Sequence, residues 1–224
     1  MGGLDIREQD LVINKEQRTP CLLALDVSSS MAGAPIEELN SGLEAFEQDI
    51  KQDELAALRC EVAIVAFGGS ATLVQDFVSV SEFTAPKLAA TGDTPLGGAI
   101  LLALDTLRAR KDAYKRTDVN YTRPWLIVIS DGAPTDDGVW QPAVERLRQE
   151  ESAKGVVVYP VGVQGADMGT MARLSAFNAP QVLQGLKFRE FFRWLSVSQK
   201  TVSTARPGGS VQVPSQQAWA QAPT

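Results

Sequence analysis

Residues 22–31 read LLALDVSSSM, an apolar run that ends in an aspartate and is followed by hydroxyl side chains. The apolar half does not alternate with polar residues, so it predicts a β-strand that is buried on both faces of a parallel sheet. Asp26, Ser28 and Ser30 then lie beyond the carboxyl end of that strand, where open parallel sheets bind ligands. Their oxygens suit a hard divalent cation such as Mg²⁺. The same residue types also cap helices, so this stretch alone leaves both interpretations open.

Two later stretches favour the cation site. Residues 91–100 read TGDTPLGGAI and place the hydroxyl of Thr94 before a predicted long helix, while residues 126–132 read LIVISDG and form a second buried strand that ends at Asp131. Strands that alternate with helices predict a doubly wound α/β sheet with helices on both faces. Right-handed crossovers bring the strand-to-helix loops to one edge of such a sheet. The sequence therefore predicts that the three polar loops meet, which helix capping does not require.

The remaining pattern completes this architecture. Strands over 61–67 and 71–78, joined by the turn GGS at 68–70, predict a hairpin and hence one antiparallel edge strand. Asp136 and Asp137 are expected to cap the helix that follows them, with a role beside the ion as the alternative. A basic stretch closes the long helix and is expected to be a solvated helix end, with partner binding as the alternative. It comprises Arg108, Arg110, Lys111, Lys115 and Arg116.

Length and composition set the class of protein. The 224 residues suffice for one α/β domain, and the net charge of −6 argues against nucleic-acid binding. Histidine is absent, which excludes His-ligated zinc, and Cys21 and Cys60 are expected to be buried, reduced thiols. Neither a signal peptide nor an apolar run of membrane-spanning length is visible, so a cytoplasmic location without membrane association is expected.

Three segments are expected along the chain. Residues 1–19 form an irregular lead-in or a short edge element, residues 20–200 form the α/β domain, and residues 201–224 form a flexible polar tail rich in Pro, Gly, Ser, Gln and Ala. If part of this tail is held against the domain, Trp219 is its expected anchor.

The motif Asp-x-Ser-x-Ser, followed by Thr and then by Asp at the end of a later strand, resembles the metal-ion-dependent adhesion site (MIDAS) of von Willebrand factor type A (VWA) domains. The stretches at 23–31, 92–100, 129–136 and 188–196 look most like the bacterial TerY-type branch, which is linked to tellurium resistance and stress response. This resemblance implies a mostly parallel six-stranded sheet. TerY-type proteins are associated with a protein kinase and a PP2C-like phosphatase, which are therefore candidate partners.

The resemblance also implies a role for each site residue. Ser28, Ser30 and Thr94 would ligate the ion directly, while Asp26 and Asp131 would act through water. With few anionic ligands the ion, Mg²⁺ or else Mn²⁺ or Ca²⁺, keeps a position for a partner's Asp or Glu. The expected function is a metal-dependent protein-binding adaptor or scaffold, not an enzyme.

Two alternatives remain at the level of sequence. A Mg²⁺-dependent phosphohydrolase of the haloacid dehalogenase type also has an aspartate after its first strand, but it normally needs a second acid two residues on, where Ser28 stands. The other alternative is a structural scaffold whose metal site stays unoccupied.

Overall fold

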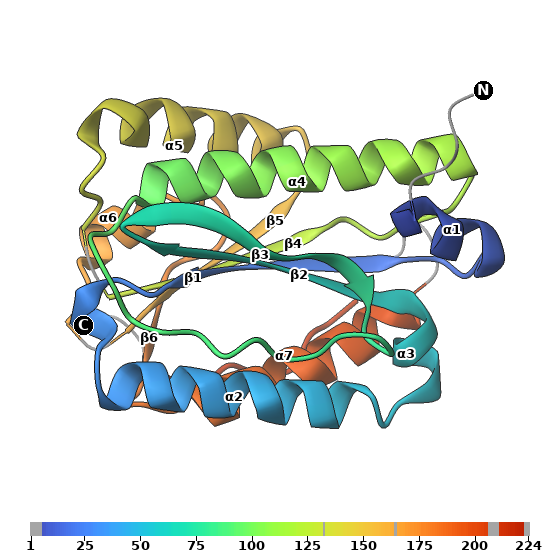
Figure 1. Cartoon of the computed structure of the whole chain (residues 1–224), viewed down its shortest axis with the longest axis horizontal. Helices are drawn as coiled ribbons and strands as arrows, with labels where there is room; N and C mark the ends of the chain where they lie inside the picture. Colours follow the sequence, from blue (N-terminus) through green and yellow to red (C-terminus); the bar gives the residue numbers. More distant parts are fainter. Residues whose placement is uncertain (1–5, 132, 164, 206–210, 222–224) are drawn as a thin grey trace.

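A computed structural model of the chain describes residues 6–131, 133–163, 165–205 and 211–221. Within these residues one seven-stranded sheet has the order β3-β2-β1-β4-β5-β6-β7 (Figure 1). All neighbouring strands are parallel except β3 and β7, which are antiparallel to β2 and β6. The strands are β1 (Thr19–Asp26), β2 (Cys60–Gly68), β3 (Ser70–Ser79), β4 (Trp125–Ser130), β5 (Val157–Gly162), β6 (Gln181–Leu183) and β7 (Ala220–Gln221).

The predicted mostly parallel α/β fold, with an antiparallel hairpin strand at one edge, is confirmed. The first six strands are those expected from the sequence, and β7 adds two residues from the C-terminal segment at the other edge. This last strand was not predicted, because its two residues carry no strand pattern of their own.

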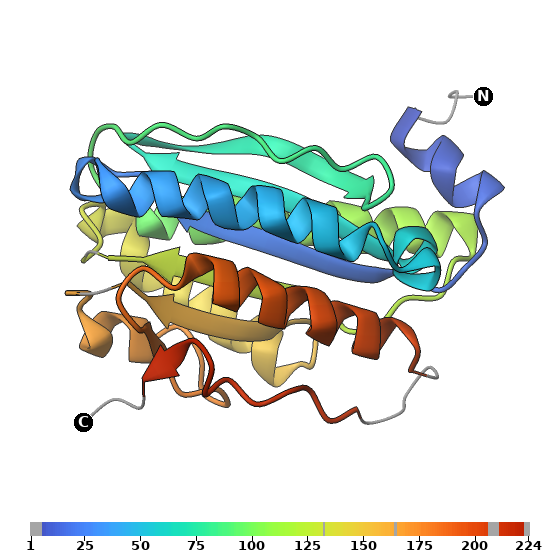
Figure 2. The same cartoon turned by 90° about the horizontal axis from the view of Figure 1, so that it is seen from below.

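Helices cover both faces of the sheet: α4 and α5 lie on one face, and α2 and α7 lie on the other (Figures 1 and 2). The α-helices are α1 (Ile6–Ile13), α2 (Ala34–Ile50), α3 (Glu54–Arg59), α4 (Leu96–Thr117), α5 (Asp137–Ser152), α6 (Met168–Ala172) and α7 (Phe188–Ser203), and a single 3₁₀ turn, η1 (Ser29–Met31), follows β1. Among the described helices, none combines the length and the apolar character needed to cross a bilayer.

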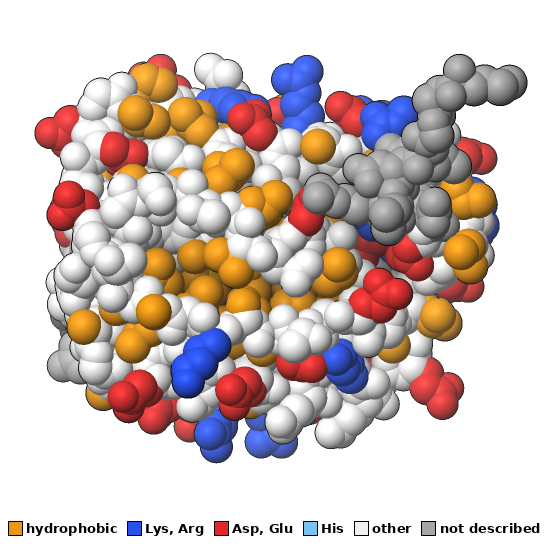
Figure 3. Space-filling model, viewed as in Figure 1, with side chains coloured by type: hydrophobic (Ala, Val, Ile, Leu, Met, Phe, Trp, Pro, Cys, Tyr) orange, Lys and Arg blue, Asp and Glu red, His pale blue; other side chains and the backbone are white. Residues whose placement is uncertain are grey.

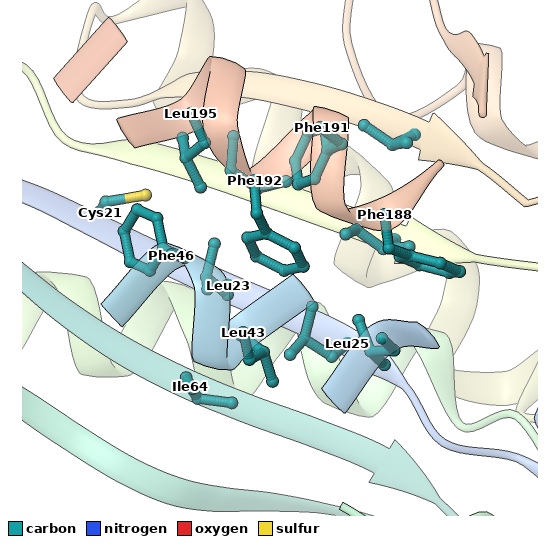
Figure 4. Packing of buried hydrophobic residues seen from close by; sticks show 14 of the residues in the cluster. Cys21, Leu23, Leu25, Leu43, Phe46, Ile64, Phe188, Phe191, Phe192 and Leu195 are labelled. Carbon is teal, nitrogen blue, oxygen red and sulfur yellow. The ribbon is translucent and has the colours of Figure 1, made fainter. Parts of the chain in front are cut away.

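Strand β1 is buried along its whole length, as its unbroken apolar run predicts. Leu22 and Ala24 pack in the core under α4 and α5, whereas Cys21, Leu23 and Leu25 pack in the core under α2 and α7. Figure 4 shows the second set facing the aromatic rings of α2 and α7. Alternate side chains thus enter two separate cores, so β1 is the fixed centre from which the loop after Asp26 extends.

The apolar stripe of α7 is core, as predicted. Phe188, Phe191 and Phe192 are fully buried, and a Cβ on Gly42 of α2 would lie 2.6 Å from the Phe192 ring. Glycine at this position therefore lets α2 and α7 approach closely. Cys21 and Cys60 are free and buried, also as expected.

Two local expectations were wrong, and one short helix was not predicted. Part of the lead-in is helical, since α1 packs through Leu11 against α4, while residues 1–5 lie outside the described residues. Helix α3 went unpredicted because its six residues are too few for a clear period. Arg110 does not lie on a solvated helix end: it is only 7% exposed and pairs with Glu61 of β2.

Apolar side chains also reach the surface beside the antiparallel edge. Figure 3 shows them gathered across the middle of one face, over the region of β3 and the extended segment that follows it in Figure 1. Val74 of β3 is 41% exposed, and Ala85 and Ala90 of the following segment are partly buried against the core.

Candidate metal centre at the carboxyl ends of the strands

The loop after β1 is joined to the loop before α4 by two backbone hydrogen bonds. The amide of Ser29 donates to the carbonyl of Gly92 at 2.9 Å, and the amide of Thr91 donates to the carbonyl of Val27 at 2.7 Å. Gly92 has a positive φ of 67°, and a Cβ at this position would lie 2.5 Å from the Cα of Gly69. Only glycine permits both this conformation and this crossing, so the glycine before Asp93 is a requirement of the site's backbone.

The loop after β4 is joined to Thr94 in the same way. The amide of Thr135 donates to the carbonyl of Thr94 at 3.0 Å, and the amide of Thr94 donates to Oγ1 of Thr135 at 3.1 Å. The three loops predicted to converge are therefore connected to one another through their backbones. Thr94 is brought to this rim by these backbone contacts.

The side chains of Ser28, Ser30 and Asp131 form one hydrogen-bonded row. The Oγ atoms of Ser28 and Ser30 lie 2.9 Å apart, and Oγ of Ser30 donates to Oδ1 of Asp131 at 2.8 Å. Ser30 and Asp131 are separated by 101 residues in the sequence, so only the tertiary fold brings them together. The row runs outward from the buried Ser28 to the exposed Ser30 and the half-buried Asp131.

Asp26 lies at the inner end of this row and is fully buried. Its Oδ1 accepts a hydrogen bond from the Ser28 amide at 2.9 Å, and its Oδ2 accepts one from Oγ of Ser130 at 2.5 Å. Burial raises the pKa of Asp26, because the charged carboxylate loses its hydration, and the nearby Asp131 raises it further, while the hydrogen bonds from Ser130 and Ser28 lower it.

Ser130 was not predicted as part of the site. It is the last residue of β4, directly before the predicted ligand Asp131, and the register pairs the preceding Ile129 with Leu25. Ser130 therefore lies beside Asp26 across the two neighbouring strands. The sequence analysis did not assign β1 and β4 as neighbours; that assignment would have found Ser130, since residues that end neighbouring parallel strands lie side by side.

The carboxylates at this rim have no cationic partner in the part of the chain that the structure describes. Among the described residues, neither Asp26 nor Asp131 forms an ion pair with Lys or Arg. The described groups that donate hydrogen bonds to the two carboxylates are neutral hydroxyls and a backbone amide. Hydroxyl and carboxylate oxygens are the donors that Mg²⁺ and Ca²⁺ prefer, so this set fits a hard divalent cation.

Hydroxyl groups are essential to that fit. In the described part of the chain there is no group of three or more His, Cys, Asp or Glu side chains that could hold a metal. Two acids alone leave most of a six-oxygen shell unfilled, so Ser28, Ser30 and Thr94, together with water, would have to supply the rest.

Asp136 caps a helix, but not the one expected. Its side chain makes no cap to α5; instead Oδ1 accepts from the amide of Gly97 at 3.1 Å and Oδ2 accepts from the amide of Gly98 at 2.7 Å. These amides lie in the first turn of α4, whose N-terminal dipole favours a carboxylate. Asp136 therefore fixes the start of α4, two residues after Thr94, against the loop that carries Asp131. Asp137 lies in the first turn of α5 and is exposed.

The fold and the site together define an α/β domain with a hydroxyl-rich, cation-type oxygen cluster at the carboxyl ends of its parallel strands. The chain belongs to the von Willebrand factor type A domain family, whose model matches residues 22–189. The matched region spans Asp26, Thr94 and Asp131. No curated protein sequence matches the chain.

Solved structures from varied organisms share this fold. The pilus adhesin SpaC of Lactobacillus rhamnosus GG superposes over 84% of this chain and 32% of its own, with a TM-score of 0.66 and 12% identity. Proximal thread matrix protein 1 of the mussel byssus covers 84% of this chain with a TM-score of 0.57 and 12% identity, and this chain spans only 49% of its length. The conserved hypothetical protein BatB of Bacteroides thetaiotaomicron matches 83% of this chain and 98% of its own, with a TM-score of 0.54 and 15% identity. At these identities the likeness shows the fold alone.

Proposed function

We propose that this chain is a metal-ion-dependent protein-binding module that takes an acidic side chain of a partner onto a divalent cation at the rim of its sheet. The observation that carries the proposal is the uncompensated pair Asp26 and Asp131, which contacts only neutral donors among the described residues. A cation bound there would supply a positive, Lewis-acidic position for an incoming carboxylate. The family, whose members are often metal-dependent interaction modules, agrees with this assignment.

The burial of each site residue indicates its role. Asp26 is inside and is oriented by Ser28 and Ser130, so it fixes the inner side of the site without facing a partner. Ser30 is exposed and Asp131 is half-buried, so the outer side of the site is the side that a partner would reach. Such a contact sets the orientation of the complex as well as its affinity, because a charged group must meet one fixed point.

The ion that we propose is Mg²⁺, with Mn²⁺ or Ca²⁺ as alternatives. We also propose that the module serves a cytoplasmic bacterial stress or tellurium-resistance system of the TerY type. Its partner there would be a kinase, a PP2C-like phosphatase or both. The support for this finer assignment is the similarity of the stretches 23–31, 92–100, 129–136 and 188–196 to that branch.

A two-stage experiment tests the proposal. Calorimetric titration of the full chain with MgCl₂ and MnCl₂ should show one site that Asp26→Ala abolishes. The matched control is Asp137→Ala, because Asp137 is an exposed acid of the same region, in the first turn of α5, and was not predicted as a direct ligand. Capture of partners from the native host should then be lost both in EDTA and with Asp26→Ala. Partner capture that is unchanged by either treatment, in a folded protein, would refute the function.

A phosphohydrolase is the second candidate from the sequence, and the site argues against it. Both oxygens of Asp26 accept hydrogen bonds and the residue is fully buried, whereas a nucleophilic aspartate has to reach its substrate. Turnover of a phosphate ester with Mg²⁺, lost in Asp26→Asn, would restore the enzymatic alternative. A scaffold with an unoccupied site predicts no titratable metal at all.

A further inference from the structure

The described end of the chain returns to the sheet and adds a strand to it. From Val211 the segment runs back alongside α7 to β7 (Figure 2), where Leu183 of β6 pairs with Ala220. The amide of Gln184 donates to the carbonyl of Trp219 at 2.9 Å, and its side-chain Nε2 donates to the carbonyl of Ala220 at 3.3 Å. Backbone groups at the edge of β6 are thus satisfied by this segment.

One side chain anchors the segment. Trp219 is only 1% exposed, and its ring lies edge-on to Phe191 at a centroid distance of 5.0 Å and next to Trp194 at 5.4 Å. Trp194 in turn donates from Nε1 to the carbonyl of Pro214 at 2.9 Å. The segment thus places an indole among aromatic rings and pairs as a strand beside it. Peptides that bind by strand addition show the same combination of contacts.

Trp219 and Ala220 belong to the core under α2 and α7, and the partly buried Val213 also packs against it. Residues 211–221 contain no charged side chain, and of residues 211–220 only Trp219 and Ala220 are buried. The indole N–H of Trp219 has no hydrogen-bond partner among the described residues although it is buried. The buried contacts are thus confined to a few positions, and a segment of this kind can open locally without unfolding the domain.

The segment covers a strand edge and aromatic rings that would otherwise be exposed. Without it, β6 would be an unpaired sheet edge, and the rings of Phe191 and Trp194 would lose their cover. Unpaired strand edges next to apolar rings are where extended peptides add to a sheet.

We propose that the edge of β6 together with Phe191 and Trp194 of α7 is a second binding site, for an uncharged, extended peptide that carries a tryptophan. In this chain the site is held by residues 211–221, which act as a displaceable intramolecular ligand. A partner with a segment of the same chemistry takes the site when the tail opens. This inference is independent of the cation site, because the two sites share no residue.

The test uses the full chain and a fluorescent peptide that corresponds to residues 211–221. Wild type should bind the peptide at least about 10-fold more weakly than Trp219→Ala, because the tethered segment competes at a high effective concentration. Gln217→Ala is the matched control and should behave as wild type, since Gln217 is exposed. The same peptide with alanine at the tryptophan position should bind neither protein.

Hydrogen exchange gives a second measurement on the wild type. The Gln184 amide should exchange faster than the amides of β1 and β4, because it is released when the tail opens.

Several outcomes would overturn the proposal. A Trp219→Ala protein that folds but does not bind the peptide would remove the site, and one that does not fold would make the tail an integral part of the core. A Gln184 amide that exchanges only with global unfolding would likewise make the tail part of the core. Concentration-dependent dimers of wild type that Trp219→Ala abolishes would assign the site to a second copy of the chain instead.

Discussion

The buried carboxylates at the two ends of the central strands have opposite kinds of partner. At the amino end, Glu61 of β2 is fully buried and receives a two-pronged contact from Arg110, whose Nε and Nη2 lie 2.8 and 2.7 Å from its oxygens. Nε of the fully buried Arg18 lies 2.9 Å away, an ion-pair distance without the alignment of a hydrogen bond, and the hydroxyl of Tyr114 also donates to Glu61. At the carboxyl end, Asp26 is equally buried, but among the described residues its hydrogen bonds come from hydroxyls and an amide.

This contrast separates a structural acid from a functional one. Glu61 lies between the guanidinium groups of Arg110 and Arg18, and Arg18 also pairs with Asp10 at 3.3 Å, so two carboxylates face two guanidinium groups at that end of the molecule. Asp26 and Asp131 carry negative charge that no described Lys or Arg neutralises. A buried charge without a partner is costly, so the carboxyl end is expected to be relieved by a cation.

The largest effect is expected at the amino ends of the strands, where Glu61 pairs with Arg18 and Arg110. Glu61→Ala would remove the buried carboxylate that lies between Arg18 and Arg110 and would leave Arg18 with Asp10 alone among the described acids, at 3.3 Å. Breaking a buried pair of this kind costs about 3–5 kcal/mol. We expect a loss of that size in the free energy of unfolding, measured with urea. The control is Glu16→Ala, which removes a partly exposed partner of Arg59 and should cost less than about 1 kcal/mol. Equal losses in the two variants would erase the distinction between this network and a surface ion pair.

Adding metal should affect only the other end. A cation at 100 times its dissociation constant should raise the free energy of unfolding by about 2.7 kcal/mol, because it binds the folded chain alone. EDTA should reverse this gain, and Asp26→Ala should abolish it. Thermal melts of wild type and Asp26→Ala, with and without Mg²⁺, provide the measurement. A gain that persists in Asp26→Ala would place the ion elsewhere and break the comparison.

A third test measures the hydrogen bond to Glu61 separately from its ion pairs. Tyr114→Phe removes the hydroxyl that donates to Glu61 and should cost about 1.5–3 kcal/mol, as is usual for a hydrogen bond to a charged group. Tyr121→Phe is its control, because Tyr121 stacks on Tyr114 and is only partly buried. Urea unfolding at neutral pH compares the two.

Tyr114 should also make the free energy of unfolding depend on pH. Burial raises the pKa of Tyr114 well above the usual 10.0, and the neighbouring Glu61 raises it further. The folded chain therefore keeps this proton at pH values where the unfolded chain releases it. The contribution of this proton to the free energy of unfolding is complete below pH 10.0 and declines as the pH rises above that value. Tyr114→Phe should therefore make the free energy of unfolding fall less steeply above pH 10.0. Identical profiles above pH 10.0 would contradict the assigned cause.

The smallest effect concerns Ser130, the site residue that was not predicted. Ser130→Ala removes a hydrogen bond to Asp26 without removing a ligand, and a loss of such support typically weakens metal binding by about 10-fold or somewhat more. Titration calorimetry with Mn²⁺ would measure this change. Ser175→Ala, which removes a buried hydroxyl that donates to Glu151, is the control and should leave the affinity unaltered. Unchanged affinity in Ser130→Ala would mean that Asp26 needs no orientation from β4.

Residues with a local pattern were predictable, and residues that depend on a distant partner were not. The loop from Asp26 to Ser30 could be placed because it follows an unbroken apolar strand, and Thr94 and Asp131 could be assigned to the same edge because right-handed crossovers leave no other arrangement. Arg110 could not be placed, since a basic residue in a basic stretch has the same local pattern whether it faces water or Glu61. Asp136 was correctly assigned to capping but to the wrong helix, because α4 is distant in the sequence.

The sequence by itself determined the order of the first six strands and of the helices α2, α4, α5, α6 and α7, the two-sided burial of β1 and the rim at which the polar loops gather. Each of these follows from the spacing of apolar residues and from the handedness of the chain. Only the tertiary structure decided which carboxylates are neutralised, that Ser130 holds Asp26, and that Trp219 closes the far edge of the sheet. The physical reason is that charge compensation and burial depend on distances between residues far apart in the sequence, such as the 104 residues between Asp26 and Ser130.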